Sequence, residues 1–147
     1  DGLAAWRGFL RAHQAVVAEL DRELVAAHAL PLAWYDVLVQ LSEAGGEATM
    51  GEISGRLLIS PSTCTRVVEK LVNAGFVARR IDDVDARVRH VSLTPAGRST
   101  LRSAAVTHLA GIERHFTSLL AGIERADGVE PATLTRLFDA MVSSTGR

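Results

Sequence analysis

Residues 60–71 read SPSTCTRVVEKL and contain the pattern that decides the fold. The Ser-Pro pair is typical of the start of a helix, because a serine at the N-cap accepts a hydrogen bond from a free backbone amide and a proline at the first helical position needs no such bond. The apolar side chains that follow share one face of that helix: Cys64, Val67, Val68 and Leu71. The opposite face is polar, so the stretch predicts a short helix with one side packed on a core and the other in solvent.

A second capped helix is predicted just before this one. Thr49 and Glu52 have the spacing of a capping box, in which each side chain satisfies a free amide of the first turn. This helix extends to Leu58, and only residues 59–60 separate it from the next, which leaves room for a sharp turn. Gly75 is suited to the left-handed position that ends the second helix. The two helices therefore predict a helix-turn-helix.

Two extended segments follow, at residues 76–81 and 87–93. The acidic residues 82–85 separate them and predict the turn of a β-hairpin. An arginine on a narrow hairpin suits the minor groove of DNA, whose negative potential attracts guanidinium groups. We expect Asp85 to hold Arg87 by a charge-assisted hydrogen bond, because aspartates at a DNA-facing turn would otherwise repel phosphate. A solubilising turn is the alternative interpretation. Helix-turn-helix followed by hairpin is the order of a winged helix-turn-helix.

Long amphipathic segments flank this unit. Residues 3–24 place an apolar side chain, or His13, every three or four positions, a seam that predicts a helix packed against another helix of the same chain or of a partner. Residues 32–42 predict another helix, residues 94–123 one long helix, and Pro131 the start of the last. The sequence thus predicts a mainly α chain with a small β-hairpin wing (α+β), organised as one domain.

Charge and composition narrow the classes of function. Hydrophobic residues make up 48% of the 147 residues, which is enough to build the core of one domain. Residues 49–98 contain eight Lys or Arg and five Asp or Glu, a net charge of +3 in a chain whose net charge is −1, so the remainder carries −4. A cationic centre between acidic flanks is typical of a protein with one DNA-facing surface, with chance as the alternative.

Motifs of enzymes and metal sites are missing from the sequence. It contains no phosphate-binding loop and no nucleophile elbow, and its five histidines lack the spacing of metal ligands. We therefore expect no enzyme, no catalytic residue, no cofactor and no metal. Cys64 is the only cysteine, no apolar run is long enough to span a membrane, and the first residues do not resemble a secretory signal. These features favour a cytoplasmic protein.

Residues 49–98 resemble the DNA-binding region of the multiple-antibiotic-resistance regulator (MarR) family. The recognition helix of that family is similar to residues 60–71 followed by AGFV at 74–77. Its wing is similar to DDVDAR at 82–87 followed by VSLTPAGR at 91–98. The resemblance implies a bacterial transcriptional repressor that binds palindromic operator DNA, an inverted repeat, as a homodimer. It also implies that a small phenolic or anionic effector releases the DNA.

The resemblance extends over nearly the whole of residues 1–147 in the order and length of the elements. It implies that residues 1–28 and 95–145 are dimerisation helices and that residues 32–94 are the DNA-binding lobe, a winged helix-turn-helix. Candidate DNA contacts are Ser60, Ser62, Thr63, Thr65, Arg66, Lys70, Arg79, Arg80, Asp85, Arg87 and Arg89. Candidate dimer contacts are Leu3, Trp6, Leu10, Val17, Leu20, Leu119, Ile123, Leu134, Leu137, Phe138 and Met141. Candidate effector contacts are His13, Trp34 and Tyr35.

Other interpretations remain open at this level. Oxidation of Cys64 would add bulk beneath the recognition helix and make the protein a redox-sensing regulator, although a small core residue is the simpler interpretation. A winged helix can also serve for protein contact without binding DNA. Among the effector candidates, Trp34 also fits a core position, Tyr35 a half-exposed packing position, and His13 a hydrogen-bonded member of the seam.

Overall fold

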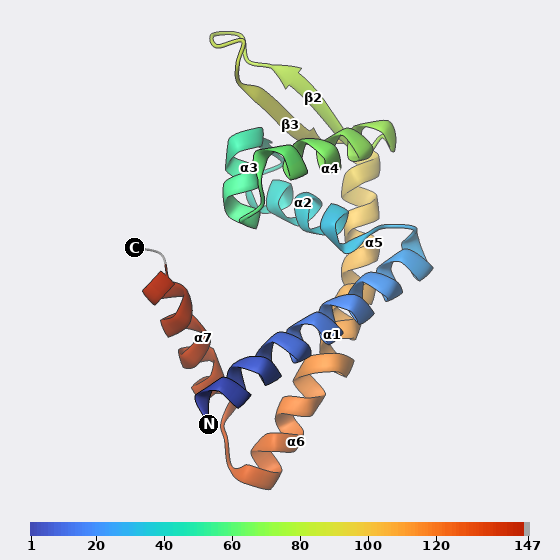
Figure 1. Cartoon of the computed structure of the whole chain (residues 1–147). Helices are drawn as coiled ribbons and strands as arrows, with labels where there is room; N and C mark the ends of the chain where they lie inside the picture. Colours follow the sequence, from blue (N-terminus) through green and yellow to red (C-terminus); the bar gives the residue numbers. More distant parts are fainter. Residues whose placement is uncertain (146–147) are drawn as a thin grey trace.

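The computed structural model describes residues 1–145 (Figure 1). The elements are α1 (Gly2–His28), α2 (Leu32–Glu43), β1 (Glu47–Thr49), α3 (Met50–Leu57), α4 (Pro61–Asn73), β2 (Val77–Ile81), β3 (Arg89–Leu93), α5 (Pro95–Ile112), the π-helical turn η1 (Glu113–Thr117), α6 (Ser118–Asp127) and α7 (Pro131–Thr145). In Figure 1 the elements from α2 to β3 form a lobe with the hairpin at its far end, and α1, α5, η1, α6 and α7 form a frame beneath it. The predicted fold class, mainly helical with a small hairpin wing, is confirmed.

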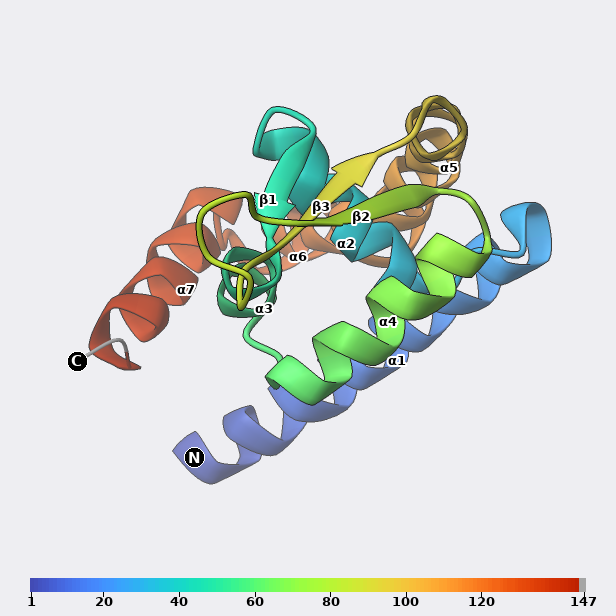
Figure 2. The same ribbon diagram turned by 90° about the horizontal axis from the view of Figure 1, so that it is seen from above.

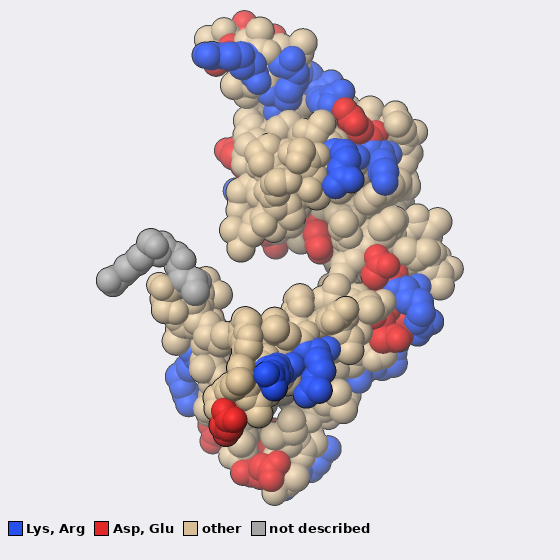
Figure 3. Space-filling view, viewed as in Figure 1, with Lys and Arg blue, Asp and Glu red and all other residues tan. Residues whose placement is uncertain are grey.

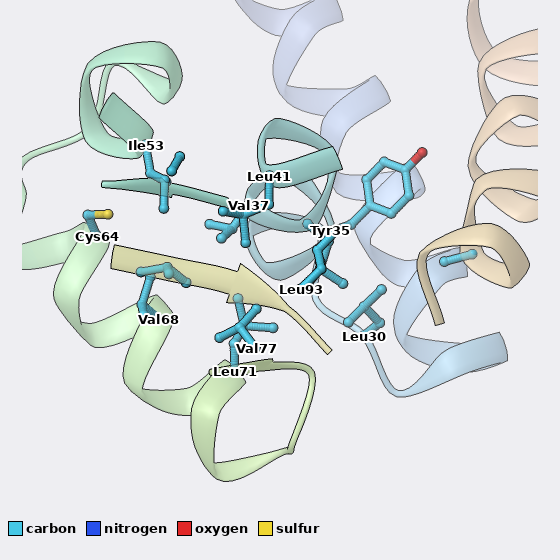
Figure 4. Packing of buried hydrophobic residues seen from close by; sticks show 14 of the residues in the cluster. Leu30, Tyr35, Val37, Leu41, Ile53, Cys64, Val68, Leu71, Val77 and Leu93 are labelled. Carbon is cyan, nitrogen blue, oxygen red and sulfur yellow. The ribbon is translucent and has the colours of Figure 1, made fainter. Parts of the chain in front are cut away.

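The core of the lobe lies between its helices and its sheet. Figure 4 shows buried side chains from α2, α3 and α4 converging on the strands. Those with no exposed surface are Val37, Leu38, Leu41, Ile53, Cys64, Val68, Leu71 and Val91. Burial of each large aliphatic side chain contributes about 1.5–3 kcal/mol. This core therefore fixes the apolar side of α4 and leaves its other side to solvent.

The helices of the lobe begin at the predicted caps. Thr49 Oγ1 accepts a hydrogen bond from the Glu52 amide at 3.2 Å, and Glu52 Oε2 accepts one from the Thr49 amide at 2.7 Å, which completes the capping box. Ser60 Oγ accepts from the Thr63 amide at 3.1 Å at the start of α4. Gly75 follows α4 with a φ of +78°, the left-handed conformation expected for it. Local side-chain chemistry thus sets these boundaries.

The sheet has three antiparallel strands in the order β1-β3-β2. The predicted hairpin is present as β2 and β3, with Val77 opposite Leu93. Strand β1 was not predicted; it pairs with the other edge of β3, with Ala48 opposite Val91. As a result β3 is the central strand, and both β1 and β2 can place side chains beside it.

The segment after the wing is not the single helix that was predicted, because η1 interrupts it. A π-helical turn holds more residues per turn than an α-helix and so rotates the side chains that follow it. Two side chains of η1 reach α1: Arg114 Nη2 lies 2.7 Å from Glu23 Oε2, and His115 Nε2 lies 2.8 Å from Glu23 Oε1. The Arg114 bond, followed by the His115 bond, lowers the pKa of the Glu23 carboxyl. These pairs join η1 to the C-terminal part of α1.

Leu20 was expected at a dimer interface, and this expectation is wrong. Its side chain is 7% exposed and lies beside Gly111 of α5. Leu24, one turn further along, is fully buried. The last two residues of the α1 seam, Leu20 and Leu24, therefore pack within the chain.

Within residues 1–145, no single helix is both long and apolar enough to cross a membrane. By length and composition α1 and α2 together would pass the same test, but the two helices bend by 85° at the break between them. Four residues of α2 are buried in the chain, as is usual for the central helix of a folded lobe.

Gly97→Ala is expected to destabilise the protein. Gly97 lies in the first turn of α5, where its amide donates to Thr94 Oγ1 at 3.0 Å, and a Cβ at this position would collide with the carbonyl oxygen of Phe76. Because backbone must move, we expect the free energy of unfolding, measured by urea titration with circular dichroism, to fall by about 1–3 kcal/mol.

The matched control is Gly55→Ala, inside α3, where an added Cβ meets nothing within 4 Å. This change should raise the free energy of unfolding by about 1 kcal/mol, because alanine favours a helix more than glycine does. A stabilised Gly97→Ala variant would show that α5 and the Phe76 backbone, between α4 and β2, do not approach as closely as the structure shows.

Candidate nucleic-acid interface

The outward face of α4 is polar and exposed, as its periodicity predicts. It is formed by Ser62, Arg66, Glu69 and Asn73. In Figure 2, which looks down on the lobe, α4 and the hairpin lie next to each other on the near side of the molecule. A single surface therefore presents both the second helix of the helix-turn-helix and the wing.

Small hydroxyl side chains gather at the N-terminus of α4. Ser60 Oγ lies 2.9 Å from Thr63 Oγ1 and 3.1 Å from Ser62 Oγ. Thr65 Oγ1 donates to the carbonyl of Pro61 at 2.9 Å. Short side chains let this end of the helix approach a groove closely, and its free amides and positive dipole end attract phosphate. Hydroxyl groups can also bond to base edges.

The turn of the wing is held by its own aspartates. Asp82 Oδ2 accepts from the amides of Val84 and Asp85 at 2.9 and 3.0 Å. The Asp85 amide, then the His90 ring and the Val84 amide, lower the pKa of Asp82 to about 2. Asp85 in turn accepts from Nε and Nη2 of Arg87 at 3.1 and 3.2 Å, and from its amide at 2.9 Å. The predicted Asp85–Arg87 pair is thus present, with the Arg87 side chain 91% exposed.

The other cationic side chains differ in how many ion pairs and hydrogen bonds they already form within the protein. Arg80 Nη2 pairs with Glu47 at 2.8 Å, and Arg89 donates to the carbonyls of Ala86 and Val88. Among the described residues, the cationic members of the DNA set with neither an ion pair nor a side-chain hydrogen bond are Arg66, Lys70 and Arg79. Figure 3 shows Lys and Arg side chains concentrated over the wing and continuing down one side of the lobe.

A pocket of about 340 Å³ lies between α3, the N-terminus of α4 and the wing. Arg79 and Arg89 line it together with the hydroxyl-bearing Ser54 and Thr65. Two guanidinium groups beside hydroxyls suit an anionic group such as a backbone phosphate. The part played by Ser54 was not predicted, because the pocket exists only once three elements meet.

Sequence analysis also missed the residues that support the wing from below. His90 of β3 lies between two carboxylates: its Nε2 is 2.7 Å from Asp82 Oδ1, and its Nδ1 is 3.4 Å from Glu47 Oε1. Glu47 belongs to β1, the strand that was not predicted, so nothing in the sequence placed its side chain near His90. Side chains of a strand alternate between the two faces of a sheet. This alternation along β3 is the local signal that His90 and Arg80 would point toward the same face.

The three effector candidates are not brought together. His13 lies in an apolar groove of about 670 Å³ between α1, η1 and α7, and neither Trp34 nor Tyr35 lines it. Trp34 is half-buried against the lobe core. Tyr35 is buried rather than half-exposed, with its ring 4.6 Å from that of His108, a residue of α5 that sequence analysis did not select. Burial lowers the pKa of His108, whose buried Nδ1 has no hydrogen-bond partner.

Most of the candidate dimer contacts are open to solvent in one chain. The exposed ones are Leu3, Trp6, Leu10, Val17, Leu119, Ile123, Leu137 and Met141. Leu134 and Phe138 of α7 are half-buried, and the Phe138 ring lies 6.1 Å from that of Phe9 on α1. The frame therefore carries a large apolar surface over α1, α6 and α7.

Cys64 is fully buried on the inner side of α4. Its Sγ lies 3.8 Å from the carbonyl of Met50, and burial raises the pKa of its thiol. Oxidation needs an accessible thiolate. The position of Cys64 therefore favours a packing role over a redox role.

The helix-turn-helix, its polar outer face and the arginine-bearing hairpin define a winged helix-turn-helix of the type found in transcriptional regulators. Comparison with known proteins supports this class. Residues 29–88 match the model of the MarR family. The HTH-type transcriptional regulator YsmB of Bacillus subtilis is 29% identical over 93 residues, which are 63% of this chain and 63% of YsmB, so the match spans less than two thirds of that relative.

Solved structures agree over almost the whole chain. AbsC, a MarR family transcriptional regulator from Streptomyces coelicolor, is similar with a TM-score of 0.80 and 28% identity, covering 95% of this chain and 88% of AbsC. Sco3205, a MarR family regulator from the same organism solved in complex with DNA, has a TM-score of 0.82 and 24% identity over 97% of this chain and 87% of its own. Residues 29–88 thus resemble the MarR family in sequence, and the chain is similar in fold to MarR family transcriptional regulators.

Proposed function

We propose that this protein is a cytoplasmic transcriptional repressor that binds inverted-repeat DNA as a homodimer, with α4 in the major groove and the wing in the minor groove. The observation that carries the proposal is the state of Arg87, which is held by Asp85 through three hydrogen bonds and still 91% exposed. A cation fixed in direction on a projecting turn loses little conformational entropy when it enters a narrow groove. The similar fold of Sco3205, solved in complex with DNA, supports this arrangement.

The remaining DNA contacts follow from the same surface. The hydroxyls at the start of α4 and the guanidinium of Arg66 face outward and are suited to base edges and phosphates. The pocket lined by Arg79 and Arg89 would take a backbone phosphate beside the wing. A winged helix used only for protein contact gives no role to this arrangement of arginines.

A second copy of the chain is the occupant that we propose for the apolar surface of the frame. Trp6 is 49% exposed, Leu10 45% and Leu119 62%, and folded monomers rarely leave contiguous apolar surface of this kind in water. A two-fold dimer buries the same patch on both copies. It would also present two α4 helices to the two halves of an inverted repeat.

Regulation by a small ligand is proposed for the contact between the lobe and the frame. Tyr35 of α2 meets His108 of α5 there, and a buried ring nitrogen without a partner is unusual in a folded protein. A ligand with a phenol or carboxylate could bond to that nitrogen and shift α2 relative to α5. In BpsR of Bordetella bronchiseptica, which shares the fold with a TM-score of 0.77 and 22% identity, DNA binding is regulated by 6-hydroxynicotinic acid.

Arg87→Ala is expected to weaken DNA binding about tenfold and to reduce the slope of log affinity against log salt by about 1. The measurement is a fluorescence anisotropy titration on the DNA upstream of the protein's own gene, at several salt concentrations. Arg22→Ala is the control: Arg22 is an exposed arginine on α1 that pairs with Glu19 at 2.6 Å. If Arg87→Ala and the native protein bind with equal affinity, the wing does not take part in DNA binding as proposed.

Leu10→Glu is expected to convert the dimer to a monomer, because the charge would be enclosed in an apolar interface without a partner. Light scattering at one protein concentration gives the mass. Val84→Ser is the control, since Val84 is 96% exposed but lies on the wing. A Leu10→Glu variant with the mass of a dimer would contradict the proposed interface.

His108→Phe tests the regulatory contact, because it keeps an aromatic ring against Tyr35 and removes the ring nitrogen. We expect 6-hydroxynicotinic acid to release the native protein from DNA and to act on this variant about tenfold less strongly, since a buried hydrogen bond to a charged group is lost. The same titration in His13→Phe is the comparison. Equal response of the native and His108→Phe proteins would place any effector elsewhere.

A further inference from the structure

Leu58 lies in the turn between α3 and α4, in a backbone conformation that leucine rarely adopts. Its φ is +54° and its ψ is +37°, which is the left-handed region. A Cβ in this region crowds the carbonyl oxygen that follows it, so glycine or asparagine usually occupies such a position. Within residues 1–145, the only other non-glycine residue with a positive φ is Ala29, at the end of α1. Leu58 is therefore the one large side chain of the described residues in this strained conformation.

Packing within the chain does not compensate for the strain at Leu58. Its side chain is 92% exposed, and among the described large apolar side chains only that of Val84, in the turn of the wing, is more exposed. The next residue, Ile59, is the one that packs against the core of the lobe. A leucine that is both strained and exposed lowers the stability of the free chain, so folding does not explain its presence.

The turn that contains Leu58 leads into the surface that we propose for DNA. Ser60, two residues further along, is also exposed and accepts the amide of Thr63 at the start of α4. Ser62 Oγ lies 3.1 Å from Ser60 Oγ. In Figure 2 the connection runs in the open from α3 to the start of α4. The leucine thus comes directly before the hydroxyl groups of the first turn of α4, and the N-terminal residues of a recognition helix are those that contact base edges.

The chemistry of the Leu58 side chain restricts what it can contact on DNA. Leucine has no charge and no hydrogen-bonding group, so it forms no favourable polar contact with a phosphate or with the donors and acceptors of a base. The apolar group that base edges present in the major groove is the C5 methyl of thymine. Contact between this methyl and a leucine removes apolar surface of both from water, which is favourable.

We propose that Leu58 is a specificity-determining residue that contacts the C5 methyl of one thymine in each half of the operator. The left-handed turn keeps the side chain exposed, and the start of α4 brings it to the edge of the major groove. This inference rests on the proposed function, which places α4 in that groove. The operator should therefore contain, in each half, a thymine whose methyl group contributes to affinity through Leu58.

The first test uses the free full-length protein and needs no DNA. Leu58→Gly removes both the strain and the exposed side chain, so its midpoint of thermal unfolding, followed by circular dichroism, should rise by about 2–4 °C. Leu58→Ala is the control: it keeps the Cβ and therefore the strain, and its midpoint should stay within about 1 °C of the native value. A lower midpoint for Leu58→Gly would show that the leucine stabilises the fold, and would overturn the proposal.

The second test removes single methyl groups from the DNA. Each thymine of the DNA upstream of the protein's own gene is replaced in turn by deoxyuridine, which lacks only the C5 methyl, and affinity is measured by fluorescence anisotropy. At one thymine of each half-site we expect the native protein to bind about fourfold more weakly, the effect of one buried methyl. Leu58→Gly should bind the unmodified DNA about fourfold more weakly and lose less than about 1.5-fold more at the same thymine.

Two further variants serve as controls for the second test. Leu58→Met keeps an apolar side chain and should keep the dependence on the methyl group. Val84→Ser removes a side chain that is 96% exposed on the wing, and should also keep it, because thymine presents its methyl in the major groove and not in the minor groove.

The outcomes separate this proposal from the proposed function. If every deoxyuridine substitution affects the native protein and Leu58→Gly equally, the contact between Leu58 and thymine is refuted while DNA binding stands. The same conclusion follows if Leu58→Met behaves like Leu58→Gly. If the native protein does not bind the DNA at all, the proposed function fails and the role of Leu58 fails with it.

Discussion

The polar surface that the lobe presents depends on the burial of the apolar side of α4. Cys64, Val68 and Leu71 are fully buried against side chains from α2 and the sheet (Figure 4). Because this side of the helix is fixed by packing, the polar side has only one direction in which to point. The same core holds Val77 and Val91 of the hairpin, so the wing and α4 keep a constant relation to each other. Their shared surface is therefore a result of packing, before any polar contact is considered.

Polar contacts then determine how the wing uses that surface. An exposed ion pair such as Asp85–Arg87 adds little to stability because water screens it, so stability does not explain the polar contacts of the turn. They restrict direction instead: Asp82 folds the turn around its carboxylate, and Asp85 aims the guanidinium of Arg87. The turn is thus highly acidic and still presents a cation, which reconciles its three aspartates with the DNA contact that we propose.

The features that could be predicted from the sequence are those that local chemistry determines. Capping residues such as Thr49 and Ser60 act within one turn of their own helix, so the helix-turn-helix and the boundaries of α4 could be located, as could the Asp85–Arg87 pair. Features that depend on distant parts of the chain were missed. The three residues of β1 have too short an alternation to identify a strand, and the apolar stripe continues through η1 without marking it.

What covers an apolar seam also depends on how distant parts of the chain pack together. By their spacing, Leu10 and Leu20 lie on the same face of α1. Leu10 is nevertheless 45% exposed, whereas Leu20 is enclosed against α5. In the same way Tyr35 and His108 are far apart in the sequence, and their ring contact appears only when α2 packs on α5. Periodicity therefore identified which face of each helix is apolar but not what covers it.

The central claim is that two copies of this surface contact one face of a duplex. A hydroxyl-radical footprint of the native protein on the DNA beside its own gene measures this directly. The account predicts two protected regions related by an inverted repeat, with centres about one or two helical turns apart and protection extending into the flanking minor grooves. A single protected half-site, or protection confined to the major groove, would contradict it.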